Sequence, residues 1–285
     1  MLAMSINENE NGNKYILVYT ESGKPTFKHI ATSETLHGQV GPYEEAQSLY
    51  VEGSNILNKC GECVVYDVGM GCGAQLIAMF HAFFINRSLS KLTVVSFDLE
   101  KEGLVSLLKN KELFPYINKF SHLLPMCIEK DSIKYVLDDE RIFEWIFIQG
   151  DFVKTISSHA KYPLADIICY DFFSPVSHSQ LWTYNIFVHL KKYVKESSCF
   201  ITYSSATCVR ASLLAAGFYV GLGIASGKKA NSTLASPTPH ILNDLLPPQW
   251  KMRFKRSQAQ FSLSETDVAK AIIEKNVSTH PQWLL

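Results

Sequence analysis

The feature that most constrains the fold of this chain is an apolar strand that runs directly into three closely spaced glycines. Residues 63–68 (CVVYDV) are followed by residues 69–73 (GMGCG), and an apolar, helix-compatible run begins at Ala74. Glycines at this spacing permit a tight turn and let a ligand approach the backbone closely. The segment therefore predicts a strand, a glycine loop and a helix that form a ligand site, although an ordinary strand–turn–helix has the same pattern.

The residues around the glycines favour S-adenosyl-L-methionine over a dinucleotide. A dinucleotide fingerprint has the spacing G-x-G-x-x-G, whereas here the third glycine comes one position earlier. Asp67 precedes the first glycine by two positions, where its carboxylate can bond the ammonium of a methionyl group. The motif thus predicts S-adenosyl-L-methionine as the cofactor.

The middle of the chain predicts an α/β fold. Short apolar strands alternate with helical stretches, and such strands are typical of a parallel sheet covered by helices on both faces. The strands are expected at 63–68, 92–97, 145–148, 165–170 and 199–203, with further candidates at 218–223 and 232–236, and the helices near 74–86, 100–110, 131–140, 179–195 and 207–216.

The N-terminal part of the chain has a different pattern. Residues 14–20 and 25–30 flank a turn that contains glycine, which predicts a β-hairpin, and Pro42 marks the start of a helix. The expected division of the chain is an N-terminal hairpin and helix extension over 1–60, a cofactor-binding core over 61–236, and a tail over 237–285 that packs on the core or contacts RNA.

Acidic residues stand at or near the ends of four successive strands. Besides Asp67, these are Asp98, Asp151 and Asp171. Ligands in open α/β sheets sit outside the carboxyl ends of the strands, so one ligand site explains the series. In such a site Asp98 would accept bonds from ribose hydroxyls and Asp151 from an adenine amine, with Phe152 available for stacking. Capping of a helix is the alternative role for Asp98, and capping of a helix or turn is the alternative for Asp171.

Several segments together resemble the MnmC-like methyltransferase family, the methyltransferase half of the bacterial tRNA enzyme that makes 5-methylaminomethyl-2-thiouridine. The resemblance covers about residues 15–236. Its segments are 33–38 (SETLHG), 44–46 (EEA), 171–175 (DFFSP), 181–183 (LWT), 202–210 (TYSSATCVR), 216–221 (AGFYVG) and 232–236 (STLAS). It implies a class I methyltransferase fold, which is a Rossmann-like, mostly parallel sheet with helices on both faces.

The resemblance implies an N-methyltransferase that acts on the 5-aminomethyl group of wobble uridine in tRNA. The residues implied for cofactor binding are Asp67, Gly69, Gly71, Gly73, Asp98, Asp151 and Glu34, the last in a covering loop. Those implied for the uridine pocket are Phe173, Pro175 and Trp182, and Arg210 and His37 are candidates for contact with RNA or the methionine carboxylate. Asp171 would orient the acceptor amine, take its proton and stabilise the developing ammonium.

Three positions depart from the family pattern. Asp67 stands where the family usually has Glu. Phe172 stands where the family commonly has a small residue, so its ring would narrow the pocket. Residues 226–231 (SGKKAN) replace a pattern that usually carries Gly-Arg-Lys. The tail after Ser236 is also too short for the flavin-dependent oxidoreductase domain of the bifunctional relatives, so we expect the monofunctional form.

Because the chain has no net charge, any tRNA would have to bind at a local basic patch. Lys and Arg together number 27 and Asp and Glu also number 27, which gives no general attraction to nucleic acid. Residues 251–256 (KMRFKR) supply a candidate patch. As a strand, this run would bury Met252 and Phe254 and present four cations to tRNA phosphates, although a solvated edge strand is the alternative.

Membranes and metals are not expected as partners. The longest apolar run, 74–85, is broken by Gln75 and His81 and is too short to span a bilayer, and no signal peptide is visible, so we expect a cytoplasmic protein. The seven scattered cysteines are typical of reduced core thiols. The Cys60-x-x-Cys63 pair has no second pair beside it, which argues against a metal site.

Two rival functions remain open. One is another transferase on the same fold, either a small-molecule amine methyltransferase or an aminopropyltransferase of the spermidine synthase type. The latter would want a denser acidic pocket than the single Asp171 offers. The other is a non-catalytic module that keeps the fold to bind RNA or protein, against which the intact glycine loop and the series of acids argue.

Overall fold

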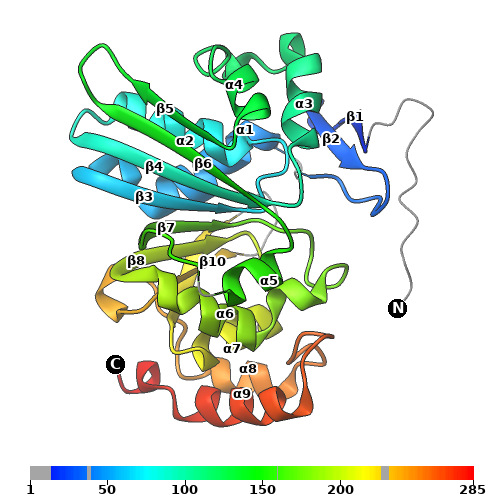
Figure 1. The fold of residues 1–285 in the computed structure, drawn as a ribbon. Coiled ribbons are helices and arrows are strands. Elements are labelled where there is room, and N and C mark those ends of the chain that lie inside the picture. Colours follow the sequence, from blue (N-terminus) through cyan, green and yellow to red (C-terminus); the bar gives the residue numbers. More distant parts are fainter. Residues whose placement is uncertain (1–13, 37–39, 159, 226–230) are drawn as a thin grey trace.

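The computed structural model describes residues 14–36, 40–158, 160–225 and 231–285, and it is built around an eight-stranded sheet (Figure 1). The strand order is β5-β6-β4-β3-β7-β8-β10-β9. The strands are β3 (Gly61–Val68), β4 (Leu89–Asp98), β5 (Ser132–Val136), β6 (Ile142–Gln149), β7 (Ala165–Tyr170), β8 (Val194–Thr202), β9 (Tyr219–Ala225) and β10 (Asn231–Ser236).

The centre of the sheet is parallel, as expected. Neighbouring strands pair in parallel from β6 through β4, β3 and β7 to β8, whereas β5, β9 and β10 pair antiparallel at the two edges. From β3 the chain moves outward to β4 and β6, and it then returns to the other side of β3 as β7. The strand order therefore reverses between β3 and β7, which is where open α/β sheets form ligand sites.

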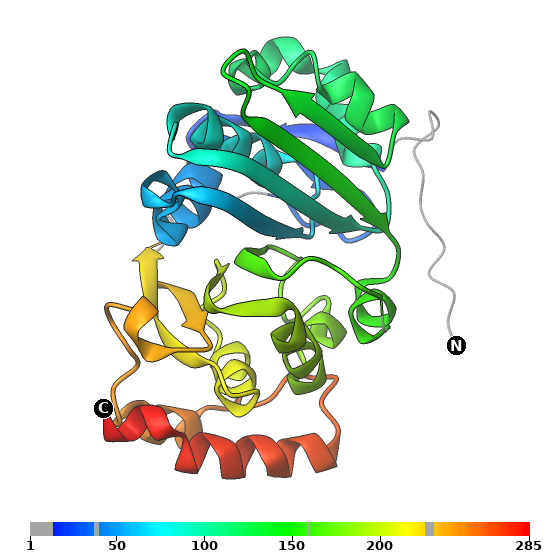
Figure 2. The ribbon, with the colours of Figure 1, turned by 60° about the vertical axis from the view of Figure 1, so that its left-hand side comes forward.

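Helices cover both faces of the sheet (Figures 1 and 2). Side chains of β3 alternate between the two faces, so that Val65 packs in one apolar cluster and Tyr66 in the other. The first cluster includes α1 (Pro42–Ala46), the π-helix η1 (Gln47–Glu52), α2 (Ala74–Ile85), α3 (Glu102–Lys109) and α4 (Leu124–Glu129). The second includes α5 (Phe152–Ser157), α6 (Tyr184–Leu190), α7 (Thr207–Ala215), α8 (Trp250–Arg256) and α9 (Asp267–Thr279).

The predicted N-terminal hairpin is confirmed. Strands β1 (Tyr15–Tyr19) and β2 (Pro25–His29) pair antiparallel, and Figure 1 shows them beside α3. Phe27 of β2 stacks on Phe114 with 5.2 Å between the ring centroids. The hairpin thus anchors the following loop next to the carboxyl ends of the strands.

The helix expected near 131–140 is wrong. Residues 132–136 form the edge strand β5, which pairs antiparallel with β6. Ile133 is buried between exposed Ser132 and Lys134, a period of two that fits a strand and not a helix. Glu140, with a φ of 66°, lies in the turn that joins the two strands.

The strand considered for 251–256 is also wrong, because this run lies in α8. Trp250 and Phe254 are buried, and their spacing of four places them on one helix face. Met252 is 50% exposed instead of buried. The helix still presents Arg253 and Lys255 to solvent, so the candidate basic patch survives in a different secondary structure.

The tail packs on the core through α8 and α9, which lie beyond α7 from the sheet in Figures 1 and 2. The division of the chain at 60 and 236 stays a prediction. All seven cysteines are free thiols, of which Cys60 is exposed and the other six are buried. Within the described residues, no helix is long and apolar enough to cross a membrane, and no three His, Cys, Asp or Glu side chains are grouped to hold a metal ion.

Candidate active site

A cavity with a volume of about 1110 Å³ opens at the carboxyl ends of the parallel strands. Its wall includes residues that follow β3, β4, β6, β7 and β8, and the segment after the N-terminal hairpin closes one side. Single drug-sized ligands occupy pockets of about 300–1,000 Å³. The cavity therefore leaves room for a cofactor and an acceptor together.

The glycine loop forms the floor of this cavity. Gly69, Gly71 and Gly73 have positive φ angles of 83°, 54° and 77°, a region that favours glycine. At Gly69 a Cβ would come within 2.8 Å of the backbone oxygen of Asp171, so glycine lets the loops after β3 and β7 touch. Gly69 and Gly71 line the cavity, whereas Gly73 lies at the N-cap of α2 and outside its wall.

Asp98 lies in the wall at the end of β4. Its carboxylate accepts hydrogen bonds from the backbone N–H of Gly71 at 2.9 Å and of Leu99 at 2.7 Å. Burial raises the pKa of Asp98 to about 6, against the lowering effect of these hydrogen bonds. Lys101 stands at the N-cap of α3, so the capping role considered for Asp98 is wrong and its carboxylate instead fastens the glycine loop.

Asp67, two residues before Gly69, is fully buried and lies outside the cavity wall. Ser96 donates a hydrogen bond of 2.7 Å to its Oδ2, and the indole of Trp145 donates to Ser96. Burial raises the pKa of Asp67 to about 7. Its Oδ1 is buried without a hydrogen-bond partner, which leaves one acceptor oxygen unsatisfied below the glycine loop.

Asp151 lines the cavity while it caps a helix. Its Oδ1 accepts a hydrogen bond of 2.9 Å from the N–H of Val153, at the start of α5. Its Oδ2 lies 4.0 Å from the ammonium of exposed Lys154. Phe152 and Val153 line the same part of the wall. The helix cap thus fixes the carboxylate at the cavity edge.

Asp171 follows β7 and reaches the wall from the opposite side of the switch point. The side-chain amide of Gln75, from the first turn of α2, donates a hydrogen bond to its carboxylate. Burial raises the pKa of Asp171 well above its usual range, and the nearby charge of Glu45 adds to this effect, while the hydroxyl of Tyr50 opposes it. A cation bound beside Asp171 would favour its ionised form.

An aromatic row forms another side of the cavity. The ring of Phe173 lies between two imidazoles, with centroid distances of 5.5 Å to His29 and 5.0 Å to His178, and the His178 ring is stacked on it. Phe172 also lines the cavity and packs against Phe152 at 5.3 Å. Phe172 therefore occupies space in the wall, as the departure from the family pattern suggested.

Three residues implied for substrate binding lie outside the cavity wall. Trp182 is fully buried and donates a hydrogen bond of 3.0 Å to the backbone oxygen of Phe173, so it supports the wall from behind. Arg210 is also buried, and its guanidinium bonds Thr233 and backbone oxygens of β10. Pro175 lies in the turn after the aromatic row but not in the wall. Burial and internal hydrogen bonds argue against direct contact of Trp182 and Arg210 with the substrate, whereas the role of Pro175 stays a prediction.

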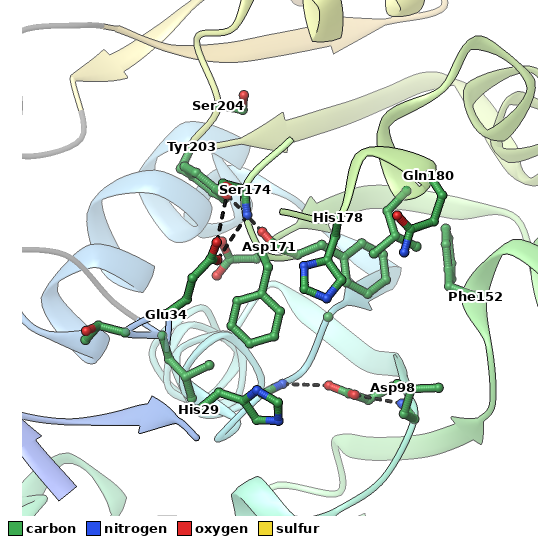
Figure 3. A pocket seen from close by; sticks show the side chains of 18 of the residues that line it. His29, Glu34, Asp98, Phe152, Asp171, Ser174, His178, Gln180, Tyr203 and Ser204 are labelled. Carbon is green, nitrogen blue, oxygen red and sulfur yellow. Dashed lines mark hydrogen bonds between the residues drawn. The ribbon is translucent and has the colours of Figure 1, made fainter. Parts of the chain in front are cut away.

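Glu34 joins the loop after β2 to the loop after β7. Its carboxylate accepts hydrogen bonds from the backbone N–H of Ser174 at 3.3 Å and from the Ser174 hydroxyl at 3.2 Å (Figure 3). Glu34 also lines the cavity, in the position expected for a covering loop. His37, and residues 226–230 of the divergent segment, lie outside the described residues.

The charged side chains of the cavity wall are acidic. Its acidic members are Glu34, Glu45, Asp98, Glu100, Asp151 and Asp171. Among the described residues no Lys or Arg lines it. Coulomb attraction in a partly buried site therefore favours a cationic ligand. Glu34, Asp98, Asp151 and Asp171 were expected in the site, and the structure adds Glu45 and Glu100.

Among the residues of the wall and its support that the sequence interpretation missed are Glu45, Gln75 and His178. Gln75 had a visible signal, because it interrupts an otherwise apolar run. Glu45 lies in the segment 44–46 that carries part of the family resemblance, but nothing in the sequence placed it in the cavity. His178 had no signal, because it lies in a segment where polar residues are ordinary.

The residues present fit S-adenosyl-L-methionine. Gly69 and Gly71 offer backbone without side chains, and Asp98 offers a carboxylate for hydroxyl donors. The unsatisfied Oδ1 of Asp67 has the chemistry to accept a bond from an ammonium. The acidic wall suits a ligand that carries a sulfonium and an ammonium.

Comparisons with known proteins agree with this geometry. A family model described as S-adenosyl-L-methionine-dependent methyltransferase matches residues 119–238. The crystal structure of MnmC2 from Aquifex aeolicus superposes with a TM-score of 0.69 and 25% identity, over 96% of this chain and 87% of that one.

Two curated relatives are similar over most of the chain. An uncharacterized protein of Methanocaldococcus jannaschii is 27% identical over 80% of this chain and 61% of its own length. The tRNA 5-methylaminomethyl-2-thiouridine biosynthesis bifunctional protein MnmC of Ectopseudomonas mendocina is 24% identical over 78% of this chain and 35% of its own length. The chain thus spans about three fifths of the first relative and about a third of the second.

Proposed function

Since the chain carries an MnmC-like, S-adenosyl-L-methionine-dependent methyltransferase domain, we propose that it methylates the 5-aminomethyl group of wobble uridine in tRNA. The observation that carries the proposal is the position of Asp171, which faces the same cavity as the glycine loop within a wall of carboxylates. Such a wall selects an amine that enters as a cation. We further propose that the protein works in the cytoplasm, where tRNA is available.

The residues of the cavity divide between the two ligands in this proposal. When bound, S-adenosyl-L-methionine supplies a methyl group on a sulfonium, ready for displacement by an amine. Gly69, Gly71 and Asp98 would hold the cofactor, with Asp67 beneath and Asp151 at the far edge. Asp171, fixed by Gln75, would orient the acceptor nitrogen, and most of the rate gain in such a displacement comes from this placement.

A second candidate acceptor is a small polyamine. The six carboxylates of the wall favour it, because a molecule with several ammonium groups can pair with more of them than a single aminomethyl group can. Transfer of a methyl group to such an amine would use the same cavity.

A transfer assay separates these acceptors. The purified protein and S-adenosyl-L-methionine are incubated with tRNA that carries 5-aminomethyl-uridine at the wobble position, with the same tRNA carrying uridine, and with spermidine. Mass spectrometry then detects the mass of one added methyl group. We expect methylation of the aminomethyl tRNA alone. Methylation of spermidine in place of tRNA would support the second candidate, and no transfer to any amine would contradict both.

Cofactor binding is expected to depend on pH through Asp98. Its pKa is raised to about 6, so the carboxylate is ionised above this value and accepts hydroxyl donors, whereas it protonates as the pH falls through 6. The affinity for S-adenosyl-L-methionine should therefore fall as the pH is lowered through 6, by up to about tenfold per unit for this group, in addition to the fall that protonation of Asp67 contributes near pH 7. Titration calorimetry between pH 5 and 8 measures this dependence.

The variant Asp98→Asn tests the assignment. It should weaken binding by about 10- to 100-fold at pH 7.5, because hydrogen bonds to a charged group are lost, and its affinity should no longer show the fall through pH 6. The matched control Asp138→Asn changes an exposed acid in the turn between β5 and β6 and should bind as the wild type does. Wild-type affinity in Asp98→Asn would remove this residue from the cofactor site.

The basic helix α8 is expected to contribute to tRNA binding. Changing Lys251, Arg253, Lys255 and Arg256 to Gln keeps the helix propensity and removes four cations. The slope of log K against log salt should fall in magnitude by up to about 0.9 for each phosphate that the variant no longer neutralises, as measured by filter binding at several salt concentrations. The control changes Lys109, Lys111, Lys130 and Lys134 to Gln. Equal slopes for the two quadruple variants would mean that α8 is only a solvated face.

A further inference from the structure

A chain of hydrogen bonds runs from Glu34 to His178 along the turn after β7. The Ser174 hydroxyl donates to Glu34 Oε1 at 3.2 Å. The hydroxyls of Ser174 and Ser177 are 3.0 Å apart, and the Ser177 hydroxyl is 3.1 Å from His178 Nδ1. The backbone N–H groups of Ser177 and His178 also donate to Ser174, which fixes the turn itself.

The carboxylate at one end decides the direction of the whole chain. An ionised carboxylate only accepts hydrogen bonds, so the Ser174 hydroxyl donates to Glu34 and its oxygen is left to accept. The Ser177 hydroxyl then donates to Ser174, and the acceptor is either the hydroxyl oxygen or the backbone oxygen of Ser174. This leaves the Ser177 oxygen as the acceptor for Nδ1–H of His178. A neutral imidazole has a single N–H, and Nε2 therefore carries a free lone pair.

The imidazole of His178 faces the cavity. It lines the wall, and Figure 3 shows it projecting from the turn toward the space in front of Asp171. Its ring is stacked on Phe173 with an interplanar angle of 30°. Packing on one side and the hydrogen bond on Nδ1 thus fix the orientation of the ring.

We propose that Nε2 of His178 takes the proton from the ammonium of the acceptor and so frees its lone pair for methylation. This inference rests on the proposed amine methyltransferase function. In the step, an N–H bond of the ammonium breaks, its electron pair stays on nitrogen, and the proton binds Nε2 to give an imidazolium. His178 then releases the proton to solvent, because the turn that carries it is exposed at Val176 and Ser177.

Burial favours the neutral form of His178, which is the form that can accept a proton. Partial burial lowers the pKa of His178, and the charge of Glu34 opposes this effect. The other ionisable group that faces it across Phe173 is His29, whose pKa is also lowered, mainly by burial. Burial and the negative charge of Glu45 raise the pKa of Asp171 and so favour its protonated form. The two residues therefore divide the work: Asp171 orients the nitrogen and His178 accepts the proton.

The test compares His178→Asn with wild type on the amine that the wild type methylates. At pH 7 we expect single-turnover rates to fall by about 10²-fold, at the lower end for a lost general base, with unchanged affinity for S-adenosyl-L-methionine. The rate of the variant should recover as the pH approaches the pKa of the amine, because free amine then forms without a base. The control His122→Asn changes an exposed histidine far from this cavity and should keep the wild-type rate. A wild-type rate in His178→Asn, or an equal loss at every pH, would overturn the proposal.

A second measurement needs no substrate. Nitrogen-15 NMR of histidine-labelled protein, assigned with His178→Asn, reports the tautomer and pKa of His178 directly. We expect the Nδ1–H tautomer in the wild type, its loss in Ser177→Ala, and a lower pKa in Glu34→Gln, since the charge of Glu34 raises that pKa. An Nε2–H tautomer in the wild type overturns the proposal that Nε2 of His178 accepts the proton, even if the protein methylates no amine. Absence of activity together with the expected Nδ1–H tautomer contradicts the proposed function alone.

Discussion

Asp171→Asn is expected to lower the single-turnover rate on the acceptor amine by about 10²-fold or more, the range for loss of one positioned group that stabilises charge in the transition state. Asparagine keeps the size and shape of the side chain, but it carries no charge to pair with the ammonium that forms as the methyl group is transferred. Gln75 would still hold it, because the asparagine carbonyl can accept the same hydrogen bond. The fold should therefore be retained.

Two measurements and a control variant define this result. Single-turnover rates from pH 6 to 9 should be low throughout, in contrast to His178→Asn, whose rate recovers at high pH. Calorimetry should show nearly wild-type affinity for S-adenosyl-L-methionine, because Asp171 is assigned to the acceptor. The matched control Asp267→Asn changes an exposed acid in the first turn of α9 and should leave the rate unchanged. Loss of cofactor binding in Asp171→Asn would instead place this residue in the cofactor site.

Gly103→Ala is expected to disrupt cofactor binding from outside the cavity. Gly103 lies in α3, and a Cβ on it would come within 2.0 Å of the backbone oxygen of Gly71 and 2.6 Å of its carbonyl carbon. Neither atom is at the end of a flexible side chain, so the glycine loop or the helix must move. Gly71 also donates its N–H to Asp98, so movement of the glycine loop would disturb this hydrogen bond as well.

The expected size of the effect follows from the cost of overpacking. Inserting one methyl group into a tight contact costs about 1–3 kcal/mol. If the glycine loop moves and the rest of the fold does not, this free energy is lost from cofactor binding, and the affinity for S-adenosyl-L-methionine falls by about 5- to 150-fold. Calorimetry measures the affinity and thermal unfolding measures the stability. The control Gly53→Ala adds a Cβ whose nearest neighbours are at 3.8–3.9 Å, an ordinary contact, and should change neither. Wild-type affinity and stability in Gly103→Ala would contradict the close packing of α3 on the loop.

Local pattern determined much of the fold. The apolar strands from Cys63 onward alternate with helices in the structure as the sequence predicts, because burial of both sheet faces leaves a continuous apolar run in each central strand. The glycines at 69–73 have the positive φ angles that their spacing indicated. Asp98, Asp151 and Asp171 line one cavity because parallel strands end at the same edge.

The errors arose where a short segment fits two structures. Residues 132–136 contain only one fully buried side chain, so their alternation is weak, and pairing with β6 decides that they form a strand. Residues 251–256 alternate basic and apolar residues, yet Trp250 just before them completes a helical face with Phe254 against the core. Tertiary packing outweighed the local pattern in both segments.

The sequence by itself determined the class of fold, the glycine loop and the acids at the strand ends, because each depends on residues that are close together in the chain. Only the tertiary structure decided which side chains share the cavity. Glu34 meets Ser174 across 140 residues, and Gln75 meets Asp171 across 96, pairings that depend on how the hairpin and α2 pack on the sheet. Trp182 and Arg210 are removed from the cavity for the same reason, since packing behind Phe173 and against β10 satisfies their polar groups within the protein. The meeting of distant segments is set by the packing of whole elements, and no local pattern of residues encodes it.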